Sequence, residues 1–231
     1  MIDNVLYIFI AGIVQGLTEF LPISSSGHLI IVKEFFNIGT KSIDLEIMLH
    51  LGTVFSIIFY YKKYLAKIIK NIINNKEDDK FFIYLLIIGC LPVAIFGLIF
   101  KNNIETEFAN ISYLPFTFML TSLFLYSTKR SKPTNSITFK IIIIVSIIQI
   151  ITLFPGISRS GITIATLLIL GVNHKESIRF SFLMAIPLIL GATLLGVDFS
   201  DYTGQDIKFM LFGSIISFIF GLLAISVTNN L

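Results

Sequence analysis

Two polar stretches interrupt an otherwise apolar chain, and both contain side chains that can take part in catalysis. The first, Gln15 to His28, reads Gln-Gly-Leu-Thr-Glu-Phe-Leu-Pro-Ile-Ser-Ser-Ser-Gly-His. The second, Gln149 to Thr163, contains Pro-Gly-Ile-Ser-Arg-Ser-Gly around Arg159. Polar and ionisable groups are expensive inside a membrane, so they face a protein interior or a wet cavity and indicate function. Hydroxyls that merely bond to helix carbonyls would leave Glu19 and His28 unexplained.

The side chains of the two stretches together suit phosphoryl transfer. Arg159 can clamp an anion and matches phosphate oxygens with two parallel N–H bonds. A serine close to a histidine and a carboxylate is the minimum for an activated nucleophile. Gly27 and Gly161 open short helices, where backbone N–H groups favour anions. Positioning and charge stabilisation do most of the work in such reactions. The candidate residues for these contacts are Glu19, Ser24, Ser25, Ser26, Gly27, His28, Ser158, Arg159, Ser160 and Thr163.

A divalent metal ion is the expected cofactor. Gln15 and Glu19 lie four residues apart, so on a helix they share a face. A carboxylate and an amide oxygen, completed by water, suit a hard cation such as Mg²⁺ or Ca²⁺. The single cysteine, Cys90, lies inside an apolar run, which excludes a thiolate metal cluster and an internal disulfide.

The two stretches resemble each other, which indicates an internal repeat. A shift of 134 positions aligns Gln15–Gly27 with Gln149–Gly161 without a gap, and seven of the thirteen residue pairs are identical. Chance matches are more frequent at Ile and Phe in an apolar chain, but Gln, Thr, Ser and Gly match as well. Two related halves, each with one polar segment broken by Gly or Pro, are typical of membrane proteins whose site lies between the repeats.

The composition places these stretches in a polytopic helical membrane protein. The chain has 231 residues, of which 55% are hydrophobic and 13% are charged, and its mean hydropathy is +0.89. A soluble domain carries roughly twice that charged fraction. The N-terminus lacks a basic stretch before its apolar run, so we expect no cleavable signal peptide. The apolar segments are Val5–Leu21, Ile23–Phe36, Leu45–Tyr61, Phe81–Phe100, Tyr113–Ser127, Ile141–Phe154, Gly161–Gly171, Phe180–Val197 and Phe209–Val227.

Segment length separates membrane spans from re-entrant pieces. A span needs about 20 residues, and about 17 are acceptable. The segments that qualify easily are Phe81–Phe100, Phe180–Val197 and Phe209–Val227, and those that qualify with their flanks are Leu45–Tyr61 and Tyr113–Ser127. Ile23–Phe36 and Gly161–Gly171 are too short, and each follows a longer segment across a break of Pro, Ser and Gly. Each pair is therefore predicted to form a re-entrant helix–loop–helix whose tip is buried against protein or a wet cavity.

The distribution of lysine and arginine sets the predicted orientation. Lys62–Lys80 and Lys129–Lys140 are interpreted as basic loops separated by two spans, so both lie in the cytoplasm by the positive-inside rule. The first re-entrant pair then starts and ends outside, and the second enters from the cytoplasm after three spans, which makes the repeats inverted. The predicted fold is one all-α membrane domain, residues 1–231, with repeats over 1–135 and 136–231. Val5–Leu21, which is long enough to span alone, is the weak point of this arrangement.

The motifs resemble those of the bacterial undecaprenyl-diphosphate phosphatase family, also called the bacitracin-resistance protein. The signature stretches are Gln15–His28 and Pro155–Thr163, with further similarity at Leu45–Thr53 and Phe180–Pro187. The resemblance implies hydrolysis of undecaprenyl diphosphate to undecaprenyl phosphate plus phosphate, which recycles the lipid carrier of cell-wall synthesis and gives bacitracin resistance. It also implies a divalent metal, re-entrant loops, and an active site open to the outer face of the cell membrane.

The same resemblance implies roles for individual residues. Gln15 and Glu19 match the family's acidic metal-binding pair, in which the first position is Glu or Gln, and Gln leaves one carboxylate for the metal. Ser25 matches the proposed nucleophile, His28 the essential histidine, and Arg159 the arginine that holds the diphosphate. The expected substrate-binding neighbours are Ser24, Ser26, Gly27, Ser158, Ser160 and Thr163. Whether Ser25, His28 or metal-bound water attacks stays open.

Further expectations concern assembly, partners and a rival function. Family members usually carry another C-terminal membrane helix, so we expect the last helix to find its packing partner in a second protomer of a homodimer. The rival function is an inverted-repeat transporter of a phosphorylated lipid or anion, which would need no nucleophile. The expected partners of the enzyme are the polyprenyl diphosphate and membrane lipids, not nucleic acid. His50, one turn after Glu46, is either a neighbour of the site or part of a polar pair lining the cavity.

Overall fold

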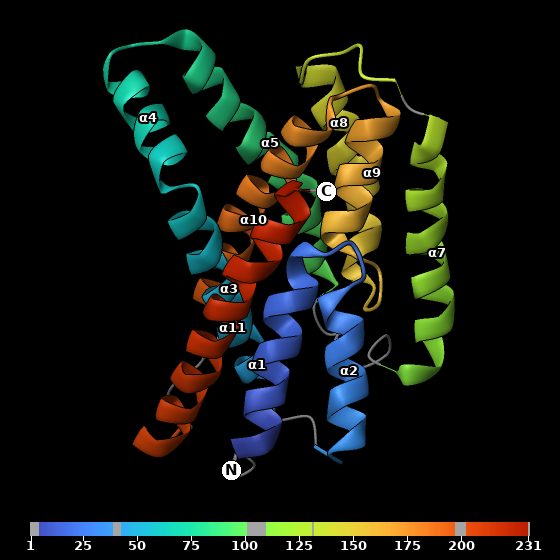
Figure 1. The fold of residues 1–231 in the computed structure, drawn as a ribbon, viewed down its shortest axis with the longest axis vertical. Coiled ribbons are helices and arrows are strands. Elements are labelled where there is room, and N and C mark those ends of the chain that lie inside the picture. Colours follow the sequence, from blue (N-terminus) through green and yellow to red (C-terminus); the bar gives the residue numbers. More distant parts are fainter. Residues whose placement is uncertain (1–4, 39–42, 101–109, 131, 197–201, 231) are drawn as a thin grey trace.

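The computed structural model describes residues 5–38, 43–100, 110–130, 132–196 and 202–230, and helices make up most of this part of the chain (Figure 1). The α-helices are α1 (Val5–Phe20), α2 (Ser25–Phe35), α3 (Ile43–Tyr60), α4 (Lys62–Ile73), α5 (Glu77–Ile99), α7 (Leu114–Ser127), α8 (Phe139–Ile148), α9 (Arg159–Ile169), α10 (His174–Gly196) and α11 (Gly204–Asn230). The short 3-10 helices are η2 (Ile111–Tyr113), η3 (Thr128–Arg130) and η4 (Gln149–Leu153). The predicted all-α fold is confirmed.

Several helices are long and apolar enough to cross a membrane, as expected for a polytopic membrane protein. By length and composition, α5, α10 and α11 each qualify. Helices α3 and α4 qualify only together, and a bend of 72° separates them. Helix α7 and the helices of the two hairpins described below are shorter. The three spans that the sequence predicts most clearly are thus confirmed, whereas the predicted span Leu45–Tyr61 belongs to a bent pair.

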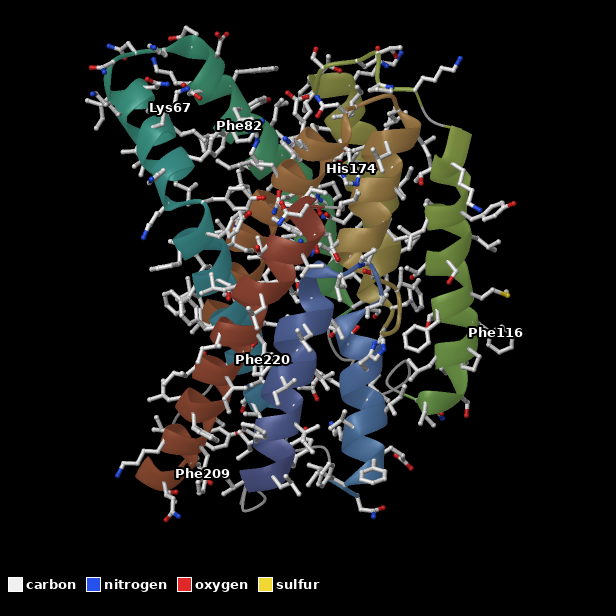
Figure 2. All side chains as sticks on the ribbon, viewed as in Figure 1. Lys67, Phe82, Phe116, His174, Phe209 and Phe220 are labelled. Carbon is white, nitrogen blue, oxygen red and sulfur yellow. The ribbon has the colours of Figure 1, made fainter. Side chains whose placement is uncertain are left out.

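The prediction of a basic loop over Lys62–Lys80 is wrong, because most of this segment is helical. It contains α4, a short turn, and the start of α5 at Glu77. Apolar residues recur along α4 at helical spacing, and Ile68 in their middle is buried, while Lys67 is exposed (Figure 2). The abundance of lysine suggested a loop, whereas the 3.6-residue period of the apolar side chains indicates a helix. Because the apolar face of α4 packs on the core, the lysines occupy the remaining face of a helix.

Two helical hairpins approach each other from opposite ends of the molecule (Figure 1). Helices α1 and α2 form the lower hairpin, α8 and α9 form the upper one, and their turns meet at mid-height. Ser160 Oγ donates to the carbonyl oxygen of Glu19 over 3.0 Å, and Gly156 N–H donates to Ser26 Oγ over 3.3 Å. These hairpins correspond to the two predicted re-entrant pairs, and they start from opposite ends of the molecule. The division into repeats at residues 135 and 136 stays a prediction.

The last helix, α11, packs against α1 and α3 of the same chain. A Cβ added to Gly12 would lie 2.9 Å from the Gly213 carbonyl oxygen, and one added to Gly16 would lie 2.6 Å from that of Ser217. Ser217 Oγ also donates to the Leu49 carbonyl oxygen over 2.8 Å. Small residues let helix backbones approach closely within a membrane. The expectation that a second protomer supplies the partner of the last helix is therefore corrected, and the homodimer itself stays a prediction.

The second hairpin is supported by a hydrophobic cluster around α10. Phe180, Phe182 and Met184 are completely buried and pack with residues of α5, α8 and α9. A smaller cluster joins α1, α2, α3 and the start of α11 around Leu45 and Leu49. Phe20 at the end of α1 also belongs to the larger cluster and packs on Phe182, with 5.0 Å between the ring centroids, so this core joins the two hairpins near their tips.

Candidate active site

Each hairpin tip contains a serine that caps the helix after it. Ser24 Oγ accepts a hydrogen bond from Gly27 N–H (3.3 Å), and Ser158 Oγ accepts one from Gly161 N–H (3.0 Å). The two serines lie 134 positions apart, so the internal repeat places equivalent caps before α2 and α9. Ser24 has φ of +69°, a left-handed conformation that is costly for non-glycine residues and clusters at functional sites. The positive ends of two helix dipoles therefore meet between the tips.

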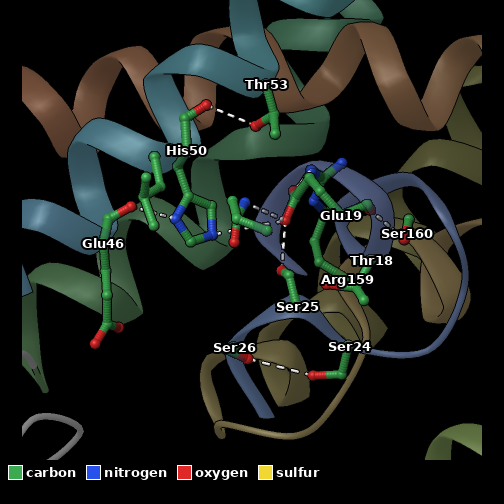
Figure 3. Close-up of polar contacts among 12 residues, drawn as sticks. Thr18, Glu19, Ser24, Ser25, Ser26, Glu46, His50, Thr53, Arg159 and Ser160 are labelled. Atoms are coloured by element: carbon green, nitrogen blue, oxygen red, sulfur yellow. Dashed lines mark hydrogen bonds and ion pairs between the residues drawn. The ribbon is translucent and has the colours of Figure 1, made fainter. Parts of the chain in front are cut away.

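Glu19, at the end of α1, is held by groups from both hairpins (Figure 3). Ser25 Oγ, at the first position of α2, donates to Glu19 Oε2 over 2.5 Å. Arg159 Nη2, at the first position of α9, donates to Glu19 Oε1 over 2.6 Å. Gln15 Nε2 donates to Oε2 over 3.1 Å from one turn earlier in α1. The Glu19 side chain is only 7% exposed, and a buried carboxylate is costly unless it is paired and hydrogen-bonded. The three donors satisfy that requirement.

Arg159 is fixed by two contacts and retains further donors. Besides Nη2, which binds Glu19, its Nη1 donates to the Ser181 carbonyl oxygen of α10 over 3.1 Å. The side chain is 17% exposed and lines a cavity. A guanidinium carries five N–H donors in a planar fork, so Arg159 can bind an anion in the cavity while its other side stays anchored.

His50, from α3, brings a fourth group to the same carboxylate. Its Nε2 lies 3.6 Å from Glu19 Oε2, and its Nδ1 lies 2.8 Å from the carbonyl oxygen of Glu46. A carbonyl only accepts hydrogen bonds, so Nδ1 carries a proton and Nε2 is the nitrogen turned to the site. Figure 3 shows the imidazole facing Glu19 while the Glu46 carboxylate points away, 3.7 Å from Lys33 Nζ. His50 is therefore a neighbour of the site.

A cavity of about 540 Å³ lies between the hairpin tips and helices α5 and α10. Its polar lining residues are Glu19, Ser24, Ser25, Ser26, His50, Thr152, Ser158, Arg159 and Ser160. Most of the remaining wall is apolar and comes from α5, α10 and the turn before α9. An apolar cavity with a few convergent polar groups is the usual form of a small-molecule site. This one is suited to a molecule with an anionic head and an apolar tail.

Comparison with known proteins identifies the family. The sequence model of the family described as bacitracin resistance protein BacA matches residues 8–231. The chain belongs to the BacA family. An undecaprenyl-diphosphatase of Thermosipho melanesiensis is 37% identical to it, over 96% of this chain and 88% of the relative. The undecaprenyl-diphosphatase of Methanosphaera stadtmanae is 36% identical over 96% and 87% of the two chains, and undecaprenyl-diphosphatase 4 of Bacillus cereus 36% over 96% and 86%.

Most of the residues predicted for the site of this BacA protein line one cavity. The predicted residues that do so are Glu19, Ser24, Ser25, Ser26, Ser158, Arg159 and Ser160. Gly27 instead lies behind the first tip, where an added Cβ would be 2.5 Å from the ring of Phe118. Thr163 is buried one turn into α9, and its Oγ1 donates to the Arg159 carbonyl oxygen over 2.8 Å. Their predicted contact with substrate stays a prediction.

His28 contacts the backbone of the first tip. Its Nδ1 lies 2.7 Å from the Ser24 carbonyl oxygen, and its ring packs on Phe118 with 5.4 Å between the centroids. The histidine that lines the cavity beside Glu19 is His50. A role for His28 in the reaction stays a prediction, and its described contacts support the turn that carries Ser25.

The divalent metal expected from the BacA resemblance would find hard oxygen donors at Gln15 and Glu19. Gln15 Oε1 is buried and has no hydrogen-bond partner within the described residues. The described residues contain no cluster of three or more His, Cys, Asp or Glu side chains, so a metal would need further ligands. Mg²⁺ commonly binds one or two carboxylates and completes its shell with substrate phosphates and water. The donors that are present fit this arrangement.

Two supporting residues of the BacA site were missed by the sequence analysis. Ser181 binds Arg159 through its carbonyl oxygen, and its Oγ lies 2.5 Å from Thr163 Oγ1. Thr121 Oγ1 of α7 accepts a hydrogen bond from Ser158 N–H over 3.1 Å. Both are hydroxyl residues within apolar helices, which is the signal that drew attention to the tips. Many other hydroxyl residues share that signal, so only the packing distinguishes these two.

Proposed function

We propose that the cavity between the hairpin tips is the active site in which this chain hydrolyses undecaprenyl diphosphate. The chain is an integral-membrane undecaprenyl-diphosphatase of the BacA family, whose activity gives resistance to bacitracin. The observation that supports the site is the Glu19 carboxylate, which is bound by Ser25 on one oxygen and by Arg159 on the other. The diphosphate and the apolar chain of the substrate match the polar end and the apolar wall of one cavity.

Arg159 is the proposed anchor of the diphosphate. It is the one cationic side chain of Lys or Arg type among the described lining residues of the cavity. The N-termini of α2 and α9 add backbone N–H groups and positive dipole ends, which favour a phosphate between them. Ser24 and Ser26 supply hydroxyls that can donate to its oxygens, whereas the Ser160 hydroxyl donates to the Glu19 carbonyl oxygen. Hydrogen bonds to charged groups contribute about 1.5–3 kcal/mol each, so Arg159 has the largest single effect on binding.

Ser25 is the proposed nucleophile, with Glu19 as its general base. The Oγ–H of Ser25 already donates to Glu19 Oε2, so its proton has an acceptor when Oγ attacks the terminal phosphorus. The bond from this phosphorus to the bridging oxygen breaks, Glu19 passes the proton to that oxygen, and undecaprenyl phosphate leaves. A water molecule then gives a proton to Glu19 and attacks the phosphoserine. Phosphate leaves as the proton returns to Ser25 Oγ.

Gln15 and Glu19 are the proposed holders of the metal ion. When bound, Mg²⁺ or Ca²⁺ would neutralise charge on the diphosphate during transfer. Gln15 Oε1 offers a free acceptor, and Glu19 Oε1 keeps a second lone pair beside the one that accepts from Arg159. Both oxygens could therefore bind the metal ion while Arg159 stays anchored to Glu19.

The cavity is proposed to open toward the outer side of the cell membrane. The basic helix α4 and the start of α8 lie at the same end of the molecule, at the top of Figure 1, and basic segments mark the cytoplasmic side. The cavity is lined by the second halves of α5 and α10, and both of these helices run away from that end. Substrate would then reach the site from the outer half of the membrane.

Phosphate release by the purified protein in detergent tests this function. Wild type should release phosphate from undecaprenyl diphosphate with Mg²⁺ or Ca²⁺. Ser25→Ala should lose at least about 10³-fold in rate, since removal of a catalytic serine can cost about 10⁶-fold. Ser122→Ala is the matched control, because its hydroxyl is exposed on α7 and bonds only its own helix, to the Phe118 carbonyl oxygen. Acid quenching with substrate labelled in the terminal phosphate should leave the label on Ser25. Full activity of Ser25→Ala would contradict the role of Ser25 as the nucleophile. A purified wild-type protein without activity would contradict the proposed hydrolysis.

A further inference from the structure

The cavity is too small for the whole substrate. Its volume is about 540 Å³, and cavities of roughly 300–1,000 Å³ enclose drug-sized ligands. An undecaprenyl chain has eleven isoprenyl units by its name, which is far more than a drug-sized molecule. Most of the chain must therefore lie outside the cavity while its diphosphate is bound at Arg159. An apolar chain outside the protein belongs in the lipid, so the cavity needs an opening toward the lipid.

The space between α5 and α10 has the form of such an opening. The two helices touch near Cys90, whose Sγ donates to the Met184 carbonyl oxygen over 3.4 Å. Beyond this contact, toward their C-terminal ends, residues of both helices line the cavity instead. Leu98 on α5 and Leu195 on α10, the last lining residues on each side, are 60% and 67% exposed. Exposed leucines on membrane helices contact lipid, so the cavity wall continues into the lipid-facing surface.

Both sides of this opening also carry small residues. Ala94 and Gly97 of α5 and Gly191 and Ala192 of α10 all line the cavity. A Cβ added to Gly191 would meet nothing within 4 Å, and one added to Gly97 would meet only the side chain of Leu153, at 3.4 Å. Glycines that pack helices together, such as Gly16, leave no such room. The space beside Gly191 is therefore open, so Gly191 is not a glycine that close helix packing requires.

We propose that the prenyl chain of the substrate passes between α5 and α10, across Ala94, Gly97, Gly191 and Ala192, into the outer half of the membrane. The opening, the α5–α10 portal, is a binding site for the isoprenyl units nearest the diphosphate. This inference rests on the proposed function, because it takes the polar end of the same cavity as the diphosphate site. It makes the portal a determinant of chain-length preference, separate from the groups that do the chemistry.

Blocking the portal tests the proposal. Gly191→Phe places a ring in open space beside the opening, and Ala94→Phe narrows it from the opposite helix. The measured quantity is kcat/KM in detergent for undecaprenyl diphosphate and for isopentenyl diphosphate, which has one isoprenyl unit. We expect each variant to lower the ratio of long-chain to short-chain kcat/KM by at least about tenfold, since two buried methylene groups already account for that factor. Gly204→Phe, at an equally open glycine outside the cavity, is the matched control.

The outcomes separate this proposal from the proposed function. A wild type that releases phosphate from neither substrate contradicts the proposed function. A wild type active on both, with the ratio unchanged in Gly191→Phe and Ala94→Phe, overturns the portal alone. An equal loss on both substrates also overturns it, because the ring then acts on the diphosphate site. If Gly191→Phe fails to fold, Ala94→Phe decides between these results.

Discussion

Replacing Arg159 by lysine separates its charge from its geometry. The guanidinium spans two groups, Glu19 Oε1 at 2.6 Å and the Ser181 carbonyl oxygen at 3.1 Å. Lysine keeps the positive charge beside the buried Glu19 carboxylate, so the ion pair that supports folding survives. Its single ammonium lacks the planar fork, however, and cannot hold both groups and present parallel donors to a phosphate. The substitution should therefore reduce catalysis much more than stability.

The size of the effect follows from the number of hydrogen bonds lost. A bidentate contact with phosphate becomes a single one, which removes one charge-assisted hydrogen bond of about 1.5–3 kcal/mol. At about 1.36 kcal/mol for each factor of ten, kcat/KM should fall roughly 10- to 150-fold. Arg159→Ala removes the charge as well and leaves Glu19 buried without a cation. Breaking a buried pair in this way costs about 3–5 kcal/mol, so stability should fall too.

The assay is phosphate release from undecaprenyl diphosphate, with thermal unfolding measured on the same preparations. Unfolding can be followed by the reaction of the Cys90 thiol with a fluorescent maleimide, because this is the single cysteine of the chain and it is buried. Arg179→Lys is the matched control. Arg179 lies on α10 outside the cavity, with its guanidinium 4.6 Å from the centre of the Tyr64 ring.

Two results would refute the reasoning about Arg159. The first is a kcat/KM of Arg159→Lys within twofold of wild type, which would show that a point charge suffices. The second is an equal loss in Arg179→Lys, which would show that the effect is not specific to the arginine of the cavity. A melting temperature of Arg159→Lys as low as that of Arg159→Ala would contradict the retained ion pair.

Three further predictions concern packing and the metal. Gly16→Ala should destabilise the protein by about 1–3 kcal/mol, because the added Cβ would lie 2.6 Å from the Ser217 carbonyl oxygen. This loss should outweigh the preference of alanine for helices. The melting temperature of Gly16→Ala should therefore fall, and that of the control Gly204→Ala should not. Gln15→Glu adds a second carboxylate beside Glu19, and the Mg²⁺ concentration for half-maximal phosphate release should drop by about tenfold; an unchanged value would contradict metal binding there. Excess chelator should abolish phosphate release without lowering the melting temperature by more than a few degrees, and activity that survives chelation would contradict the metal requirement.

The local parts of the fold could be predicted because they depend on neighbouring residues. The apolar runs of α5, α10 and α11 and the Pro/Ser/Gly breaks at the hairpin tips are visible in the sequence. The capping roles of Ser24 and Ser158 were not predicted, although each serine bonds a backbone group only three residues away. Helix α4 was missed, although its period is equally local, because its lysines suggested a loop.

Which of the two histidines lies nearest to Glu19 could not be predicted in the same way. His28 is three residues from Ser25 in the sequence, yet its Nδ1 contacts the carbonyl oxygen of Ser24. His50 comes from another helix and reaches the Glu19 carboxylate. Sequence spacing shows which residues share a helix face, but it does not show how that face is turned relative to a neighbouring helix. The packing of α3 against α1 therefore determines which histidine lies beside Glu19.

The sequence by itself determined the helical membrane class, the two polar tips, the resemblance to the BacA family and the residue types at the site. The tertiary structure decided that Glu19 joins the tips, bonded to a serine 6 residues away and to an arginine 140 residues away. It also decided that α11 packs within its own chain and that the cavity continues between α5 and α10. The physical reason is that composition and short-range periodicity are encoded residue by residue. Contacts between distant helices depend on how all of them pack at once.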